Sequence, residues 1–234
     1  MINFYNSRKQ VQVIKKAYNQ TVEDFKNGRS ELEYLPDNFK NSVEFKKFIK
    51  TTQCCNSGDI LIKDYLNPID GMNYLDVGSC ANLISYKLHE WQSLYYGIDI
   101  SQKLVNVTNS FVKTNRIIIG GLVASEIAYL PFTNDYFDLA SVIGVLEYYE
   151  IDYNILALQE LNRVLKNEGK LVIDLPNETH PGLITMIEYE KYLGRPRKTI
   201  VSRQEFITVL KIFFKIEDID DSQLMIKFFL RNSK

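Results

Sequence analysis

The stretch 74–82, followed by 96–100, most constrains how this chain can fold. An apolar run leads into Asp76 and Gly78, a helix-length interval follows, and a second apolar run ends in Asp99, 23 residues beyond Asp76. In a strand–turn–helix–strand unit of this spacing, backbone N–H groups at the turn approach a ligand, and the acid after the second strand accepts hydrogen bonds from ribose hydroxyls. The stretch therefore predicts a nucleotide-binding unit, with one glycine in a turn that commonly carries two or three.

The length and charge of the chain exclude several protein classes. Its 234 residues, 45% of them hydrophobic, suffice for one sizeable α/β domain and an appendage. A net charge of −1 argues against a general nucleic-acid binder. Because no apolar run approaches the length of a membrane span and residues 1–16 lack the apolar centre of a signal peptide, we expect a cytoplasmic protein without membrane contact.

The three cysteines do not indicate a structural role. Two of them, Cys54 and Cys55, are adjacent, so they form neither a disulfide framework nor a spaced metal site. We interpret them as reduced thiols and expect no metal.

Helical and strand patterns divide the chain into two parts. Residues 1–70 carry apolar side chains at three- and four-residue steps, with Gly28 placed to end the first helix, and are predicted to form a helical N-terminal lid. Residues 71–234 alternate between predicted strands at 73–77, 94–98, 116–119, 137–143 and 170–175 and predicted helices at 82–91, 101–114 and 152–165.

The end of the chain departs from this alternation. A helix capped by Ser202 is followed by two strand-like runs, 214–219 and 224–230, which are separated by a short acidic turn and predict a hairpin. The fold class is therefore α/β, a Rossmann-like doubly wound sheet of seven strands with an antiparallel last strand.

The ligand of such a sheet binds at the carboxyl ends of the strands, where Asp99 is placed to hold a ribose. The alternative is that Asp99 caps the next helix. Ser101 already serves as that cap, which favours the ribose role.

Five segments in register resemble one known family. They are 76–78, 97–101, 130–138, 145–148 and 160–171. Together they make residues 72–176 similar to the class I S-adenosylmethionine-dependent methyltransferases, particularly their small-molecule, type 11-like group. The closing hairpin resembles the reversed seventh strand of that fold, and Tyr18 lies in a segment similar to a family helix that closes over the cofactor.

The resemblance implies S-adenosylmethionine as cofactor, with S-adenosylhomocysteine as product. It puts the ribose on Asp99 and the adenine between Ile100 and Ile127, with the Glu126 carboxylate accepting the exocyclic amine. Glu126 as a solvated loop acid is the alternative. The implied cofactor residues are Tyr18, Asp76, Gly78, Ser79, Cys80, Asn82, Asp99, Ile100, Glu126, Ile127 and Ile143.

Two residues depart from the family pattern, because Cys80 and Asn82 stand where it has glycine. Asn adopts a left-handed backbone cheaply, whereas Cys held there would cost roughly 1–2 kcal/mol. A catalytically degenerate binding protein and a non-methylating enzyme that uses S-adenosylmethionine therefore stay as alternatives. Cys80 as a nucleophile is disfavoured, because no histidine or lysine lies close in sequence to activate it. A nicotinamide dehydrogenase is disfavoured because the turn lacks a glycine-rich pyrophosphate cradle.

The reaction implied is methyl transfer to an O, N or C atom of a small-molecule acceptor, by in-line displacement in which positioning supplies most of the acceleration. The candidate catalytic residues are Glu147, Tyr148 and His180, among which His180 is favoured as a base. Residues 182–199 form a possible substrate-covering insertion. The candidate substrate residues are Tyr149, Tyr189, Arg195 and Arg197.

The arginines could receive a carboxylate or phosphate through a bidentate fork. A solvated basic loop is the favoured alternative for this segment. We expect a monomer or a homodimer.

Overall fold

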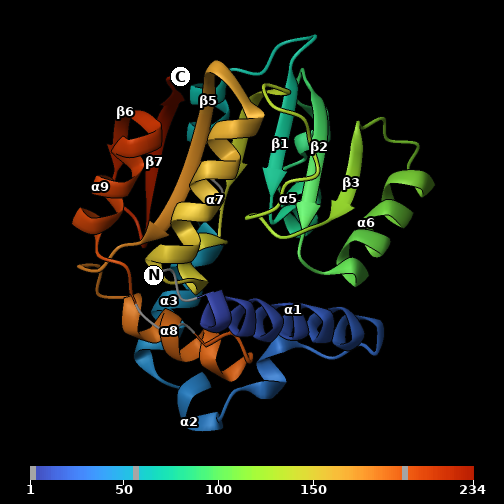
Figure 1. Cartoon of the computed structure of the whole chain (residues 1–234). Coiled ribbons are helices and arrows are strands. Elements are labelled where there is room, and N and C mark those ends of the chain that lie inside the picture. The colour runs from blue at the N-terminus through green and yellow to red at the C-terminus, as the bar shows by residue number, and fades with distance from the viewer. Residues whose placement is uncertain (1–3, 55–57, 197–199) are drawn as a thin grey trace.

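A single sheet organises the part of the chain that the computed structural model describes, residues 4–54, 58–196 and 200–234. Its seven strands lie in the order β3-β2-β1-β4-β5-β7-β6 (Figure 1). They are β1 (Asn73–Val77), β2 (Leu94–Asp99), β3 (Gly121–Ala124), β4 (Phe137–Val142), β5 (Leu165–Pro176), β6 (Phe214–Asp220) and β7 (Met225–Asn232). Strands β1 to β5 pair in parallel, whereas β7 is antiparallel to both β5 and β6. The predicted doubly wound sheet with an antiparallel last strand is confirmed.

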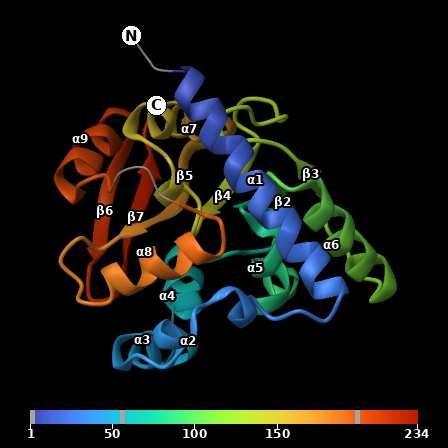
Figure 2. The same ribbon diagram turned by 90° about the horizontal axis from the view of Figure 1, so that it is seen from below.

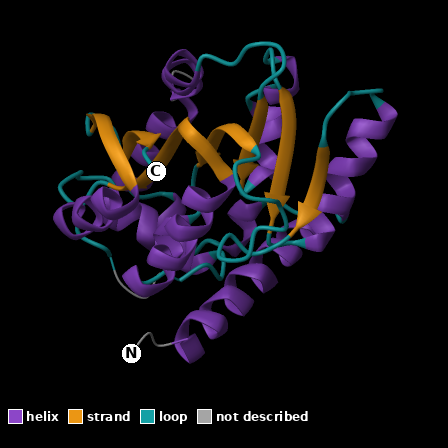
Figure 3. Ribbon diagram, turned by 45° about the horizontal axis from the view of Figure 1, so that its top comes forward, coloured by secondary structure: helices purple, strands orange, loops and turns teal. Residues whose placement is uncertain are grey.

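Helices cover both faces of the sheet (Figure 3). The longer ones are α1 (Phe4–Lys26), α3 (Val43–Cys54), α4 (Gly58–Leu66), α6 (Gln102–Thr114), α7 (Ile151–Val164), α8 (Leu183–Tyr192) and α9 (Arg203–Phe213). The shorter ones are η1 (Glu31–Tyr34), α2 (Asp37–Lys40), α5 (Ser79–Ser85), η2 (Leu88–Glu90) and η3 (Leu146–Tyr148). No helix among these is long and apolar enough to cross a membrane within the described ranges.

The two faces of the sheet build two cores, because side chains alternate along each strand. Leu171 and Ile173 of β5 belong to the core under α7 and α9, whereas Val172 between them belongs to the core under α4 and α5. A third cluster lies outside the sheet. There Phe39, Phe45 and Phe48 of the N-terminal helices pack on Leu183 and Met186 of α8.

Helix α1 crosses the carboxyl ends of the parallel strands (Figures 1 and 2). Val11 and Ile14 bury their side chains in the core under α7 and α9. Gly28, predicted to end this helix, follows it with φ 68°. The Arg29 N–H donates to the Asp24 carbonyl at 2.9 Å, which satisfies one of the last carbonyls of the helix. The end of α1 is therefore fixed by local sequence.

The third strand lies at Gly121–Ala124, so its prediction at 116–119 is wrong. Arg116 leaves α6 with φ 55°, and Ile118 is 87% exposed, which does not fit a strand between two helical layers. Ile117 and Ile119 anchor this connection by packing on the core under α4 and α5. The three isoleucines favoured a strand locally, but β3 pairs with β2 only from Gly121, opposite Tyr96.

The helix after the first strand is shorter and earlier than the predicted 82–91. It runs from Ser79 to Ser85, and Lys87, with φ 49°, separates it from the 3₁₀ turn at Leu88–Glu90. The chain therefore enters a helix directly after Gly78, with no intervening loop.

Candidate functional site

The turn after β1 depends on Gly78. This residue has φ 79° and ψ 35°, and its N–H donates to the Ile98 carbonyl of β2 at 2.9 Å. A Cβ built on Gly78 would lie 2.5 Å from Cγ2 of Val145, so any other residue would both strain the backbone and clash. The tight turn lets a ligand approach the backbone at the start of α5.

The backbone strain that the sequence suggested for this turn is absent from the described structure. Cys80 and Asn82 both lie inside α5, so their backbone is right-handed and needs no glycine. The Cys80 side chain lies outside the described atoms. The Asn82 amide is 3.4 Å from a carboxylate oxygen of Asp76 and faces the main cavity described below.

Asp76 lies buried beneath the turn and does not line that cavity. Its carboxylate accepts hydrogen bonds from the Tyr95 hydroxyl at 3.0 Å and from the Ser141 hydroxyl at 2.8 Å. Burial raises the pKa of Asp76 from 3.8 to about 7, and the two hydroxyl donors limit that rise. Asp76 therefore stabilises the region around the turn through its buried hydrogen bonds and does not contact the cavity.

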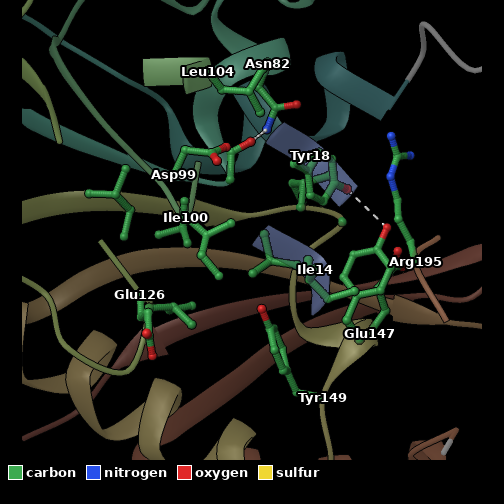
Figure 4. Close-up of a pocket in the computed structure, with 18 of the residues that line it drawn as sticks. Ile14, Tyr18, Asn82, Asp99, Ile100, Leu104, Glu126, Glu147, Tyr149 and Arg195 are labelled. Atoms are coloured by element: carbon green, nitrogen blue, oxygen red, sulfur yellow. Dashed lines mark hydrogen bonds between the residues drawn. The ribbon is translucent and has the colours of Figure 1, made fainter. Parts of the chain in front are cut away.

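A main cavity of about 430 Å³ opens at the carboxyl ends of β1, β2 and β4, beneath α1 (Figure 4). Of the implied cofactor residues, the ones that line it are Tyr18, Gly78, Asn82, Asp99, Ile100, Glu126, Ile127 and Ile143. Ser79 is buried outside it. The fold thus brings together side chains from five segments between α1 and the end of β4.

One end of the main cavity combines a carboxylate with apolar walls. Asp99 is 8% exposed, and its Oδ1 accepts the Ser101 N–H at 2.8 Å. Ser101 caps α6 by accepting the Leu104 N–H, as predicted, and its hydroxyl donates to Asn19 of α1 at 2.6 Å. Beside Asp99 lies the apolar side chain of Ile100, with Glu126 beyond it (Figure 4).

Two tyrosines lie at the opposite end. The Tyr18 and Tyr148 hydroxyls are 3.2 Å apart, and Tyr148 donates to Glu190 at 2.9 Å. Burial raises the pKa of both phenols well above the usual value, so both are protonated at neutral pH. Because Tyr148 donates its one proton to Glu190, Tyr18 donates to Tyr148, and the Tyr18 oxygen can accept a hydrogen bond from a ligand. Neither tyrosine supplies a phenolate base. Glu147, 9% exposed, also lines this end.

Arg195 is held by side chains from α1, η1 and α8. One guanidinium nitrogen, Nη2, donates to the Thr21 hydroxyl and to a Glu31 carboxylate oxygen, each at 2.8 Å. Nη1 lies 3.8 Å from Glu190, and the guanidinium carbon lies 4.5 Å from the centre of the Tyr18 ring. Arg195 is thus paired with two carboxylates, so it is not available as an open fork for an anionic group.

Glu31 and Glu190 were missed by sequence reasoning. They lie 159 residues apart in the chain, and neither belongs to a motif. Glu190 is near Arg195 in the chain, and the Arg195 N–H donates to its carbonyl at 2.8 Å. Glu31 reaches Arg195 only because η1 packs beside α1 and α8, so no sequence pattern could have identified it.

Two of the candidate catalytic and substrate residues, His180 and Tyr189, are not brought to the main cavity. His180 lies outside its lining, where its Nδ1 accepts the Gly182 N–H at 3.0 Å in the turn before α8. Tyr189 packs against Phe45 and Phe48 and donates to Glu31. Arg197 lies outside the described residues. Tyr149, by contrast, lines the cavity, with its ring on that of Tyr153.

Comparison with known proteins finds a family similarity over part of the chain. The family model described as a methyltransferase domain matches residues 75–173. A curated relative, the uncharacterized protein MJ0638 of Methanocaldococcus jannaschii, is 31% identical over 144 residues. That match covers 61% of this chain and 57% of the relative, so the chain spans little more than half of that protein's length.

Solved structures share the fold at low sequence identity. The PH0226 protein of Pyrococcus horikoshii aligns with a TM-score of 0.59 at 17% identity, over 88% of this chain and 99% of that one. The geranyl diphosphate C-methyltransferase of Streptomyces coelicolor, in complex with Mg²⁺, geranyl diphosphate and S-adenosyl-L-homocysteine, aligns with a TM-score of 0.63 at 13% identity. This second match covers 82% of this chain and 84% of that one.

Proposed function

We propose that this chain, whose residues 75–173 match the model of a methyltransferase domain, is an S-adenosylmethionine-dependent enzyme that methylates a small-molecule acceptor held beneath α1. The observation that carries the proposal is the main cavity. It joins a buried carboxylate and apolar walls at one end to tyrosines and a buried glutamate at the other, under a covering helix. A small enclosed site of this kind suits a small molecule better than a polymer.

The residues present fit S-adenosylmethionine, the cofactor of this family. Asp99 offers a carboxylate for the vicinal ribose hydroxyls. Ile100 and Ile127 are apolar walls for the adenine, and Glu126 is an acceptor for its amino group. The absence of a side chain at Gly78 lets the amino-acid end of the cofactor approach the backbone.

When bound, S-adenosylmethionine supplies an electrophilic methyl group, so the protein must mainly position the acceptor and exclude water. Tyr18 and Ile14 of α1 roof the cavity and exclude water. The Tyr18 oxygen, held by its hydrogen bond to Tyr148, accepts a hydrogen bond that orients the acceptor. If the acceptor must lose a proton, Glu147 is the better-placed base, because it lines the cavity and His180 does not.

Ligand-dependent stability tests the proposal. At about 100 times the dissociation constant, a ligand that binds only the folded protein adds about 2.7 kcal/mol to the free energy of unfolding. We expect S-adenosylmethionine and S-adenosylhomocysteine to raise the melting temperature of the full chain and NAD to leave it unchanged. Transfer of tritium from methyl-labelled S-adenosylmethionine to a small-molecule fraction would then separate catalysis from binding.

Two results would contradict the proposal. One is a melting temperature that neither sulfur compound raises. The other is stabilisation by NAD equal to that by S-adenosylmethionine. Binding without transfer to any small-molecule fraction would favour the degenerate, non-catalytic alternative instead.

A further inference from the structure

A second cavity of about 430 Å³ lies on the other side of α1 from the main cavity. Its walls come from α1, from Glu31 and Tyr34 of η1, and from residues 192–194 at the end of α8. Half of the side chains that line it are apolar or aromatic, and the other half are polar or charged. The apolar and aromatic ones are Val13, Ala17, Tyr34, Tyr192 and Leu193. None of the implied cofactor residues whose side chains are described lines it.

Helix α1 is the wall between the two cavities. Ile14 and Tyr18 line the main cavity, whereas Val13 and Ala17 line the second one. Residues four positions apart lie on the same face of a helix, so one face of α1 lines the main cavity and a neighbouring face lines the second cavity. Thr21 lines both cavities and marks where the two faces meet.

The two cavities share lining side chains near Thr21. Glu31, like Thr21, lines both cavities, and Arg195 Nη2 donates to both of these residues at 2.8 Å. The Arg195 Nε is buried and has no hydrogen-bond partner among the described residues. A buried donor without a partner is unfavourable, so an incoming polar group that accepted from Nε would be stabilised. Thr21, Glu31 and Arg195 thus form a partition of side chains between the two cavities, and passage through it requires these side chains to change rotamer.

The main cavity is small for two ligands. Small-molecule sites commonly span about 300–1,000 Å³, and 430 Å³ is near the lower end of that range. On the proposed function, the cofactor takes most of this space. We infer that the second cavity is the outer part of the acceptor site, and that the acceptor is an elongated molecule. Its polar head passes the partition, and its apolar or aromatic tail stays between α1, Tyr34 and Tyr192.

Two probes that differ only in length test this inference on the full chain saturated with S-adenosylhomocysteine. Benzyl alcohol and 6-phenylhexan-1-ol carry the same ring and hydroxyl, and calorimetry gives the affinity of each. We expect the longer probe to bind at least about tenfold tighter, because its additional methylenes bury apolar surface in the second cavity.

Filling the second cavity should remove that advantage. Ala17→Phe places a ring in the cavity, and Val13→Trp does so from a position that is 37% exposed, where folding is less at risk. Both should leave the affinity for S-adenosylhomocysteine unchanged. Gln12→Phe is the matched control, because Gln12 is exposed on the same helix and lines neither cavity.

Equal affinity of the two probes for the wild-type chain would overturn the inference, as would a length advantage that survives in both filled variants. If S-adenosylhomocysteine itself fails to bind the wild-type chain, the proposed function fails, and the inference falls with it.

Discussion

At the scale of single residues, Asp99 carries most of the expected cofactor recognition. Asp99→Ala should weaken S-adenosylmethionine binding by about 1.5–3 kcal/mol, because two hydrogen bonds to a charged group would be lost from a buried site. Calorimetry measures this directly. Asp99→Asn keeps an oxygen that can accept from the Ser101 N–H. A loss of affinity in this variant would therefore report the contact with the ligand and not a change in the turn.

The exposed Asp70 supplies the control for this prediction, since Asp70→Ala removes a carboxylate from a position that does not line the main cavity. An unchanged affinity in Asp99→Ala would remove Asp99 from the cofactor site.

The buried carboxyl of Asp76 predicts a pH-dependent stability. Its pKa of about 7 in the folded chain lies above the value of the unfolded chain, so the folded state holds more protons between these two values. The free energy of unfolding should therefore fall as pH rises toward 7. Relative to Asp76→Asn, the wild type should lose on the order of 2–3 kcal/mol between pH 5 and pH 8.

Urea unfolding of both proteins across this range measures the difference. Parallel profiles for wild type and Asp76→Asn would mean that the carboxyl titrates as an ordinary acid or that neighbouring donors stabilise its charge fully.

The residues that sequence reasoning located are those whose role is local. Ser101 was identified as a helix cap because its signal lies within three residues, and the structure bears this out. Arg195 was singled out as a charged loop residue, but its partners Glu31 and Glu190 were not, since their association depends on how three helical segments pack. His180 was expected near the site because it follows the fifth strand. Its imidazole instead accepts a hydrogen bond from the Gly182 N–H.

At the scale of elements, α1 should control access to the main cavity. It is fastened to α6 by the Asn19–Ser101 hydrogen bond and by the Glu23–Lys103 ion pair at 2.8 Å. Lys16 is exposed in the middle of this helix. Lys16→Pro removes a backbone hydrogen bond and kinks the helix at a cost of about 3 kcal/mol or more. We expect at least a tenfold loss of cofactor affinity and faster proteolysis within α1.

Lys16→Ala is the matched control, because it removes the same charge and keeps the helix. The cooperative unfolding of the sheet should persist in both variants. Full turnover in the proline variant would show that α1 does not act as a lid.

Element boundaries were predictable where capping or turn chemistry is strong. Gly28 ends α1 and Ser202 caps α9, both as expected. The third strand was misplaced because three isoleucines favour a strand locally, whereas the pairing with β2 decides where the strand begins. Strand pairing is a long-range property, so local preference could not settle it.

At the scale of the whole molecule, Asn232 joins the last strand to the centre of the fold. Its amide nitrogen lies 3.0 Å from the Leu165 carbonyl, and its amide oxygen accepts from Asn162 at 2.6 Å. Asn232→Ala should lower the free energy of unfolding by about 1–3 kcal/mol, because buried polar groups at the start of β5 lose their partners. Cofactor affinity should stay unchanged, since the site lies at the opposite ends of the strands.

Ser233→Ala is the control, because Ser233 is the exposed neighbour of Asn232. It tests whether any truncation at this end of β7 lowers stability or only the loss of the Asn232 hydrogen bonds does. Urea unfolding of the two variants gives the comparison. Equal stability of Asn232→Ala and wild type would mean that the hydrogen bonds to Asn162 and Leu165 add nothing net.

The overall architecture could be predicted from the alternation of strand and helix signals, because parallel strands need crossover helices and the closing hairpin needs only a short turn. The second cavity could not be predicted from the sequence. It depends on the third hydrophobic cluster, in which the helices before the sheet pack on α8, and no periodicity within either segment specifies that contact.

The register of α1 has a consequence for how such a protein can change. Adjacent positions, 13 and 14 or 17 and 18, face different cavities, so a substitution at 13 or 17 reshapes one wall and spares the other. A one-residue insertion upstream within the helix would rotate every side chain before it by about 100° relative to those after it. Point substitutions on this helix can therefore retune one ligand at a time, whereas length changes disturb both at once.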